Sequence, residues 1–163
     1  MALVIVTTAG ADNANAYASL VDAEDYALTL PIRTDWAAAD DATKNAALVQ
    51  ATRMLDTLVW AGWRSEPAVQ ALQWPRQGVC DRENYSLDPA TIPAKIRDAC
   101  CEFAVRLIAD DRAADAGGLA PETIEVGPLK IGKMRRSPIP ASVLEMVREF
   151  LESAGSGPRM VRA

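Results

Sequence analysis

Two short segments say most about the fold, Leu72-Gln73-Trp74-Pro75-Arg76-Gln77-Gly78 and Ile92-Pro93-Ala94-Lys95-Ile96-Arg97-Asp98-Ala99. The first predicts a stiff loop that carries an aromatic ring and a guanidinium, because proline restricts the backbone. The second predicts the start of a helix, because a proline in the first helical turn loses no needed hydrogen bond. Apolar residues then recur at helical spacing, at Ile96, Cys100, Phe103 and Leu107.

Further helices are expected on both sides of these segments. Ser19 and Asp22 fit a capping box, so a helix should run to about Leu30 and stop before Pro31. A second helix should begin near Asp40 or Asp41 and end near Gly62. Its apolar positions recur at helical spacing, at Leu48, Ala51, Leu55 and Leu58. A last helix should follow Pro140, with its apolar side at Val143, Val147, Phe150 and Leu151.

Two segments favour strands. Residues 2–8 are rich in β-forming side chains and predict a short strand. Residues 123–131 alternate apolar and polar side chains around Gly127-Pro128, which predicts a hairpin. Because a two-stranded hairpin is marginal alone in water, we expect it to pair with another subunit. The expected intersubunit residues are Ile124, Val126, Leu129, Ile131 and Arg76.

The sequence therefore predicts a mainly α protein, a small helical bundle of about four helices with a short β-hairpin arm and an extended C-terminal tail. Residues 1–116 should form the helical body, with a long ordered loop over 63–91. Residues 117–137 should form the hairpin arm, 138–154 a helix that packs on the body, and 155–163 the tail.

The composition argues against several functions. The net charge is −5, which disfavours general affinity for nucleic acid. There is no histidine and there are only three cysteines, so we expect no catalytic residues, no metal site and no cofactor. The apolar start is too short for a signal peptide, and no run is long enough to cross a bilayer. We therefore expect a non-enzymatic protein that is not exported and has no membrane partner.

The aromatic residues allow two interpretations. Trp74 either anchors a protein interface or fills the core beneath its loop, and Arg76 either contacts a partner or pairs with a carboxylate. Trp36, Trp60 and Trp63 either stack on single-stranded bases or pack inside the protein. Packing is favoured, because stacking platforms lie in basic grooves and Trp36 has acidic neighbours.

The strongest cationic segment is the basic cluster, defined as Lys130, Lys133, Arg135 and Arg136. It either contacts DNA or an acidic partner surface, or is a solvated strand end. Near the C-terminus, Arg159, Met160, Val161 and Arg162 follow a Gly-Ser-Gly link. These four residues either insert into a neighbouring protein or form a free end.

A resemblance covers about Asn15 to Leu151. The upstream motifs are Tyr17-x-Ser19-Leu20-x-Asp22-Ala23 and Ala46-Ala47-Leu48-x-x-Ala51-Thr52-Arg53-x-Leu55-Asp56, followed by Leu72-Gln73-Trp74-Pro75-Arg76 and Ile92-Pro93-x-x-Ile96. In this order they resemble the head-to-tail connector (adaptor, or head-completion) proteins of tailed bacteriophages. Some members of that family carry a label as DnaT-like single-stranded-DNA-binding proteins.

The resemblance implies a ring, commonly dodecameric, beneath the portal of a phage head. Its partners would be copies of itself, the portal protein and the next neck or tail protein, and packaged DNA would pass through without specific binding. Arg159, Met160, Val161 and Arg162 would contact the portal. The protein would be made in the host cytoplasm and located in the virion neck. The alternative is a replication accessory protein that binds single-stranded DNA.

Overall fold

The computed structural model describes residues 3–109, 123–126, 129–132 and 138–152. It contains α1 (Leu20–Leu28), α2 (Thr34–Ala38), α3 (Asp41–Leu55), α4 (Ala94–Ala109) and α5 (Ala141–Val147), which a 3₁₀ turn extends over Arg148–Phe150. The protein is mainly helical, with a small antiparallel hairpin, which confirms the predicted fold class. No helix within these ranges is long and apolar enough to cross a membrane.

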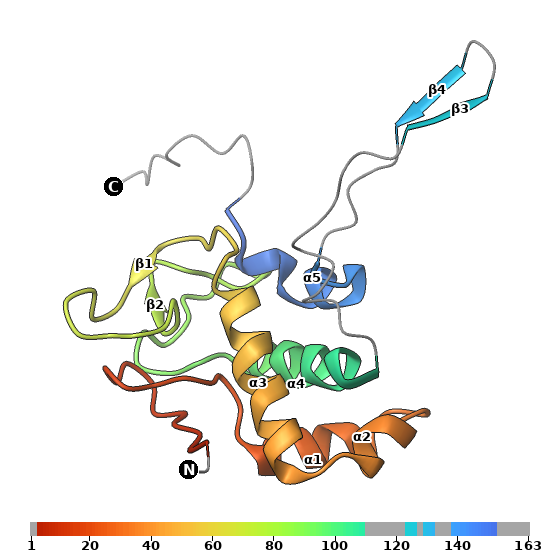
Figure 1. Ribbon diagram of the computed structural model, residues 1–163. Coiled ribbons are helices and arrows are strands. Elements are labelled where there is room, and N and C mark those ends of the chain that lie inside the picture. Colours follow the sequence, from red (N-terminus) through yellow and green to blue (C-terminus); the bar gives the residue numbers. More distant parts are fainter. Residues whose placement is uncertain (1–2, 110–122, 127–128, 133–137, 153–163) are drawn as a thin grey trace.

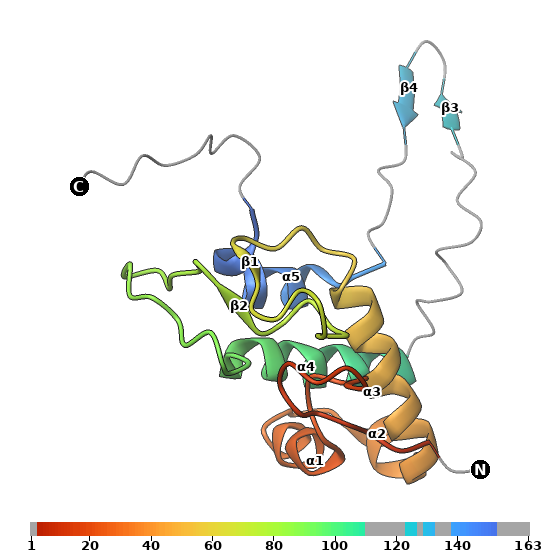
Figure 2. The same ribbon diagram turned by 90° about the vertical axis from the view of Figure 1, so that its left-hand side faces the viewer.

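Helices α3 and α4 cross at the centre of the body (Figure 1). The predicted apolar positions account for this packing: Leu48 and Leu55 of α3 and Ile96 and Phe103 of α4 are fully buried. Helix α5 covers α4 with Val143 and Val147, and α1 contacts α4 from another side. In Figures 1 and 2, α1 and α2 lie at the lower end of the body and β1 and β2 at the upper end.

The helix starts follow local hydrogen-bonding chemistry. The Ser19 Oγ accepts a hydrogen bond from the Asp22 N–H at 3.1 Å, and the Asp22 carboxylate accepts one from the Ser19 N–H at 2.9 Å. This is the predicted capping box. Asp40 caps α3 by accepting from the Thr43 N–H at 2.8 Å, and hydrogen bonding by the Thr43 side chain, with a further contribution from this N–H, lowers the pKa of Asp40. Both caps satisfy backbone donors that have no partner inside the helix.

Two sequence predictions about these elements are wrong, and one helix was missed. Residues 3–8 form no strand, because the Asn15 side chain bonds the Val6 N–H and the Val4 carbonyl instead. Helix α3 ends at Leu55, so Leu58 lies outside it. The short helix α2, which was not predicted, follows Pro31 and buries Trp36.

Two small antiparallel sheets complete the fold. Strand β1 (Trp63–Arg64) pairs with β2 (Arg76–Gln77) inside the long loop, and the Trp74–Pro75 peptide bond before β2 is cis. Gly62 precedes β1 with φ +66°, and a Cβ there would lie 2.3 Å from the Gln77 carbonyl oxygen, so only glycine fits.

The predicted hairpin is confirmed. Strand β3 (Thr123–Val126) pairs with β4 (Leu129–Gly132) in register Ile124 to Ile131, and in Figure 1 it stands apart from the helical body. The side chains of Ile124, Val126, Leu129 and Ile131, and with them the expected intersubunit contact, lie outside what the structure describes. The tail at 155–163, with Arg159, Met160, Val161 and Arg162, also lies outside it.

Candidate functional site

Trp74 of the first informative segment is a core residue. It is 1% exposed and packs edge-to-face against Trp60 and Phe150, with ring centroids 5.6 and 5.7 Å apart. These contacts join the long loop to the C-terminal 3₁₀ turn. The interpretation that Trp74 fills the core beneath its loop is therefore confirmed.

The Arg76 guanidinium is used within its own chain. It is 8% exposed, and its Nε and Nη2 donate to the Ala61 and Gly62 carbonyls, each at 2.7 Å. Nη1 donates to the Gln73 side-chain oxygen at 3.0 Å. Its hydrogen-bond partners are carbonyl oxygens, where the sequence suggested a carboxylate. Burial lowers the pKa of Arg76, but these contacts hold the charge in place.

A buried polar contact joins three distant segments. The Tyr17 hydroxyl donates a hydrogen bond to the Asp56 carboxylate and accepts one from the Trp74 N–H at 3.3 Å. The Tyr17 N–H donates to the Thr52 hydroxyl at 3.1 Å. Burial raises the pKa of Asp56 to about 6 and raises the pKa of Tyr17 well above its usual value. These groups stabilise the fold, and Tyr17 also lines one wall of a cavity.

The three cysteines are free thiols. Cys100 and Cys101 are buried in α4, and Cys80 is exposed. Burial raises the pKa of Cys100 to about 11, which keeps it a thiol at neutral pH. Within the described part of the chain, no group of three or more Cys, Asp or Glu side chains is placed to hold a metal ion.

Trp63 differs from the other three tryptophans. Trp36 and Trp60 are buried, as the sequence favoured, but Trp63 is 61% exposed. Its six-membered ring lies against Gly78, where a Cβ would come within 2.8 Å of a ring carbon. The ring therefore sits close to the Gly78 backbone while the side chain stays largely open to solvent. We call this arrangement the Trp63 platform. An ordered aromatic face of this kind suits stacking by a planar ligand.

A groove begins beside the Trp63 platform. Gln77 is the cross-strand partner of Trp63, so their side chains lie on the same face of the small sheet. Gln77, Ser65 and Glu66 line a cavity of about 390 Å³. A second cavity of about 320 Å³ adjoins it, because Ala9 and Ala90 line both. Together we call these two cavities the N-terminal groove.

Arg97 lines the second cavity and is the only cation among the described residues that line the groove. Asp22, Thr7 and Thr91 line the same cavity. The Asp22 carboxylate is committed to the Ser19 cap. The hydrogen bond from the Ser19 hydroxyl lowers the pKa of Asp22 most, and the Ser19 N–H and Arg97 lower it by smaller amounts. The groove thus presents hydroxyl and amide groups, the Arg97 guanidinium and the Glu66 and Asp22 carboxylates, and the Trp63 platform adjoins it through the cross-strand partner Gln77. Its size falls within the roughly 300–1,000 Å³ typical of ligand sites.

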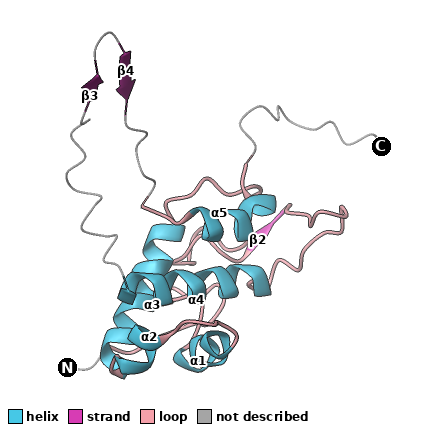
Figure 3. Ribbon diagram, turned by 90° about the vertical axis from the view of Figure 1, so that its right-hand side faces the viewer, coloured by secondary structure: helices cyan, strands magenta, loops and turns pink. Residues whose placement is uncertain are grey.

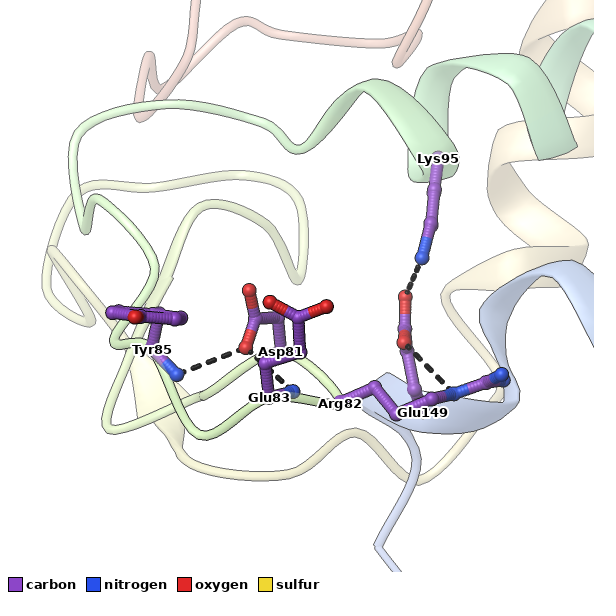
Figure 4. Close-up of polar contacts among 6 residues, drawn as sticks. All are labelled: Asp81, Arg82, Glu83, Tyr85, Lys95 and Glu149. Carbon is purple, nitrogen blue, oxygen red and sulfur yellow. Dashed lines mark hydrogen bonds and ion pairs between the residues drawn. The ribbon is translucent and has the colours of Figure 1, made fainter.

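A second exposed aromatic, Tyr85, lies on a loop that acidic residues organise (Figure 4). The Asp81 carboxylate accepts hydrogen bonds from the Glu83 and Tyr85 N–H groups, each at 2.9 Å. Behind the loop, the largely buried Glu149 carboxylate bonds Lys95 and lies 3.8 Å from the Arg82 Nε. Glu149 therefore ties this loop to α4 and to the C-terminal turn. The loop's own carboxylates make it a poor phosphate site.

Nothing in the described part of the structure places the cations of the basic cluster in this groove. Lys130 lies on β4, but its side chain is outside the described residues, as are Lys133, Arg135 and Arg136. Sequence reasoning missed the groove, since its walls come from distant parts of the chain that share no local pattern: residues 7–10, 65–66, 75, 77 and 89–92, with Tyr17, Asp22 and Arg97.

The comparisons with known proteins identify the family. A family model described as "Putative DnaT-like ssDNA binding protein" matches residues 1–163, so the chain belongs to that family. The comparison with curated proteins gave no match. The comparison with solved structures gave none either.

This match corrects the main functional prediction. The chain was expected to be a phage head-to-tail connector. Its expected partners were further copies in a ring, a portal protein, a neck or tail protein, and packaged DNA that passes through without specific binding. The family that matches over the whole chain is the DnaT-like one, and that prediction is therefore wrong. The finding agrees instead with the alternative of a single-stranded-DNA-binding protein.

Proposed function

We propose that this protein binds single-stranded DNA in the N-terminal groove, with one base stacked on the Trp63 platform. The observation that carries the proposal is the match to the DnaT-like family model over residues 1–163. The geometry supports it, because an exposed ring fixed over Gly78 adjoins a groove of suitable size.

The groove favours single strands over duplexes. Stacking on Trp63 needs a base whose face is free, and a base inside a duplex offers none. From Trp63 a strand would pass Gln77 and Ser65 toward Arg97, whose guanidinium suits a phosphate. Because only one cation lines the described groove, stacking should supply most of the affinity at this site.

The test is binding of a fluorescently labelled oligothymidylate, followed by anisotropy at low salt. Wild-type protein should bind it more tightly than a duplex of equal length. Trp63→Ala should weaken binding about 5- to 150-fold, which corresponds to the roughly 1–3 kcal/mol of one stacked base. Tyr85→Ala is the matched control, because Tyr85 is a similarly exposed aromatic that lies outside the β1–β2 sheet and on a different loop.

The intrinsic fluorescence gives a second measurement. Trp36, Trp60 and Trp74 are buried, so quenching by a stacked base should come from Trp63. Quenching on titration with oligothymidylate should be present in wild type and absent in Trp63→Phe. Wild-type protein that binds no single-stranded DNA at low salt would overturn the proposed function.

A further inference from the structure

The exposed side of α1 carries a row of apolar side chains that the core does not use. Val21, Leu28 and Ile32 are 70%, 67% and 79% exposed, whereas Ala23 and Ala27 on the other side of α1 are buried. Val21, Asp25 and Leu28 follow the i, i+4, i+7 spacing of one helix face, and Ile32 continues the row beyond the helix end. We call these four residues the α1 stripe. It lies at the α1–α2 end of the body (Figure 3).

The helix that presents this stripe is firmly held. Its start has the Ser19–Asp22 capping box, and the Tyr26 hydroxyl donates to the Glu102 carboxylate of α4 at 3.3 Å. At its end, the Arg33 guanidinium donates to the Ala27 carbonyl at 3.1 Å. The stripe is therefore a fixed surface, and a partner would bind it without first ordering α1.

The segment that carries the stripe is acidic in sequence. Between residues 20 and 41 there are six carboxylates and one arginine, a local charge of −5. The carboxylates are Asp22, Glu24, Asp25, Asp35, Asp40 and Asp41. Asp25 lies within the stripe itself. Glu24 is paired with Lys44 at 2.6 Å, and that contact lowers the pKa of Glu24.

This charge decides what kind of partner fits. A DNA strand would be repelled here, since phosphates bind positive surfaces. An apolar row crossed by a carboxylate and bordered by others is complementary to a helix with apolar anchors and flanking Lys or Arg side chains. A second copy of the chain would bring the same negative charge to the contact and is therefore disfavoured.

We propose that the α1 stripe binds a basic amphipathic helix of a partner protein. The partner's apolar anchors pack on Val21, Leu28 and Ile32, and one of its cations pairs with Asp25. None of the four stripe residues lines the N-terminal groove, although the neighbouring Asp22 does, and the proposal does not depend on DNA binding.

The probe is a labelled synthetic helix with one leucine face and one lysine face, added to the full-length protein and followed by anisotropy. Wild type should bind it. A variant with Val21→Ser, Leu28→Ser and Ile32→Ser should bind at least about tenfold more weakly, a loss of about 1.4 kcal/mol. The matched control is Val59→Ser with Val69→Ser, which are exposed apolar residues elsewhere. Circular dichroism checks that each variant is folded.

A second variant separates specific docking from bulk charge. Asp25→Lys should weaken binding of the basic helix and strengthen binding of an otherwise equal helix with a glutamate face. A scrambled peptide of the same composition, which cannot form an apolar face, should bind wild type weakly. Equal binding of the scrambled peptide, or no binding of the amphipathic helix, would overturn the proposal. So would sedimentation showing a wild-type dimer that the triple serine variant converts to monomer.

Discussion

The Tyr17 hydroxyl donates a hydrogen bond to the Asp56 carboxylate, 39 residues further along the chain. Tyr17 precedes α1, and Asp56 is the C-cap of α3. The same hydroxyl also accepts the Trp74 N–H, so one phenol connects two helices to the long loop. Because burial raises the pKa of Asp56 to about 6, this connection makes the stability of the fold depend on pH.

Asp56→Asn should remove that dependence. A carboxyl whose folded pKa is raised stabilises the fold below its unfolded pKa, near 3.8, and this stabilisation is lost as the pH rises through about 6. At about 1.4 kcal/mol per pKa unit, the loss approaches about 3 kcal/mol. Asparagine keeps an acceptor for Tyr17 and does not ionise. Urea unfolding from pH 4 to pH 7 should therefore show the variant gaining stability relative to wild type.

Asp22→Asn is the control for this titration. The Ser19 hydrogen bonds lower the pKa of Asp22, so its stabilisation is complete once the pH is above its unfolded pKa. The free energy of unfolding of Asp22→Asn should therefore lie below that of wild type by a constant amount between about pH 5 and pH 7. If Asp56→Asn shows the same constant difference, the raised pKa of Asp56 does not act in the folded protein.

Arg76→Lys should destabilise the fold although it keeps the charge. The guanidinium reaches the Ala61 and Gly62 carbonyls and the Gln73 side chain from three nitrogens. A lysine ammonium cannot reproduce that planar geometry, and each buried carbonyl left unpaired costs about 1–3 kcal/mol. We expect the free energy of unfolding to fall by at least about 2 kcal/mol. Arg148→Lys, at an exposed ion pair with Glu145, should change it little.

Local patterns were enough to predict most of the helices. The capping box at Ser19 and the apolar repeat through Ile96 and Phe103 involve residues only a few positions apart, so the local sequence is sufficient to predict these helices. The end of α3 was misplaced because Leu58 continues the repeat in sequence while the chain turns away after Leu55. Helix α2 was missed because five residues are too few for a visible period.

The motifs that carried the connector resemblance explain why it misled. Their residues Tyr17, Thr52, Trp74 and Ile96 are fully buried. The Arg76 side chain donates a hydrogen bond to the Ala61 carbonyl of the same chain. Such residues determine how the chain packs, so they are shared by proteins that pack alike and do not distinguish what those proteins bind. The Trp63 ring meets Gly78 only after β1 and β2 pair, with Gln77 as the cross-strand partner of Trp63. No short sequence pattern predicts that β1 and β2 pair.

Phe150→Ala should release the C-terminal segment from the body. Phe150 packs against Trp74, its carbonyl accepts from the Ala61 N–H at 2.9 Å, and the Glu152 N–H donates to Val59 at 3.0 Å. Truncating a buried phenylalanine costs about 3–5 kcal/mol. Urea unfolding should show this loss, and the Ala61 and Glu152 amides should exchange hydrogen faster. Val69→Ala, at an exposed site, should change stability by less than about 0.5 kcal/mol.

Binding of single-stranded DNA should depend on salt through the basic cluster. The protein is acidic overall, with a net charge of −5, while Lys130, Lys133, Arg135 and Arg136 place four cations within seven residues. Each phosphate contact on a single strand contributes about −0.7 to the slope of log affinity against log salt. If all four make such contacts, the cluster contributes about −2.8 to the wild-type slope, and replacing all four with alanine should remove that part.

The same measurement separates the two parts of the proposed interface. Trp63→Ala should lower the affinity at every salt concentration and leave the slope unchanged, because stacking releases no counterions. The fourfold alanine variant should lose affinity mainly at low salt and should keep the quenching of Trp63. A fourfold variant with the wild-type slope would show that the basic cluster makes no phosphate contacts. Base stacking on Trp63 would then be tested in the absence of the basic cluster, by adding Trp63→Ala to the fourfold alanine variant.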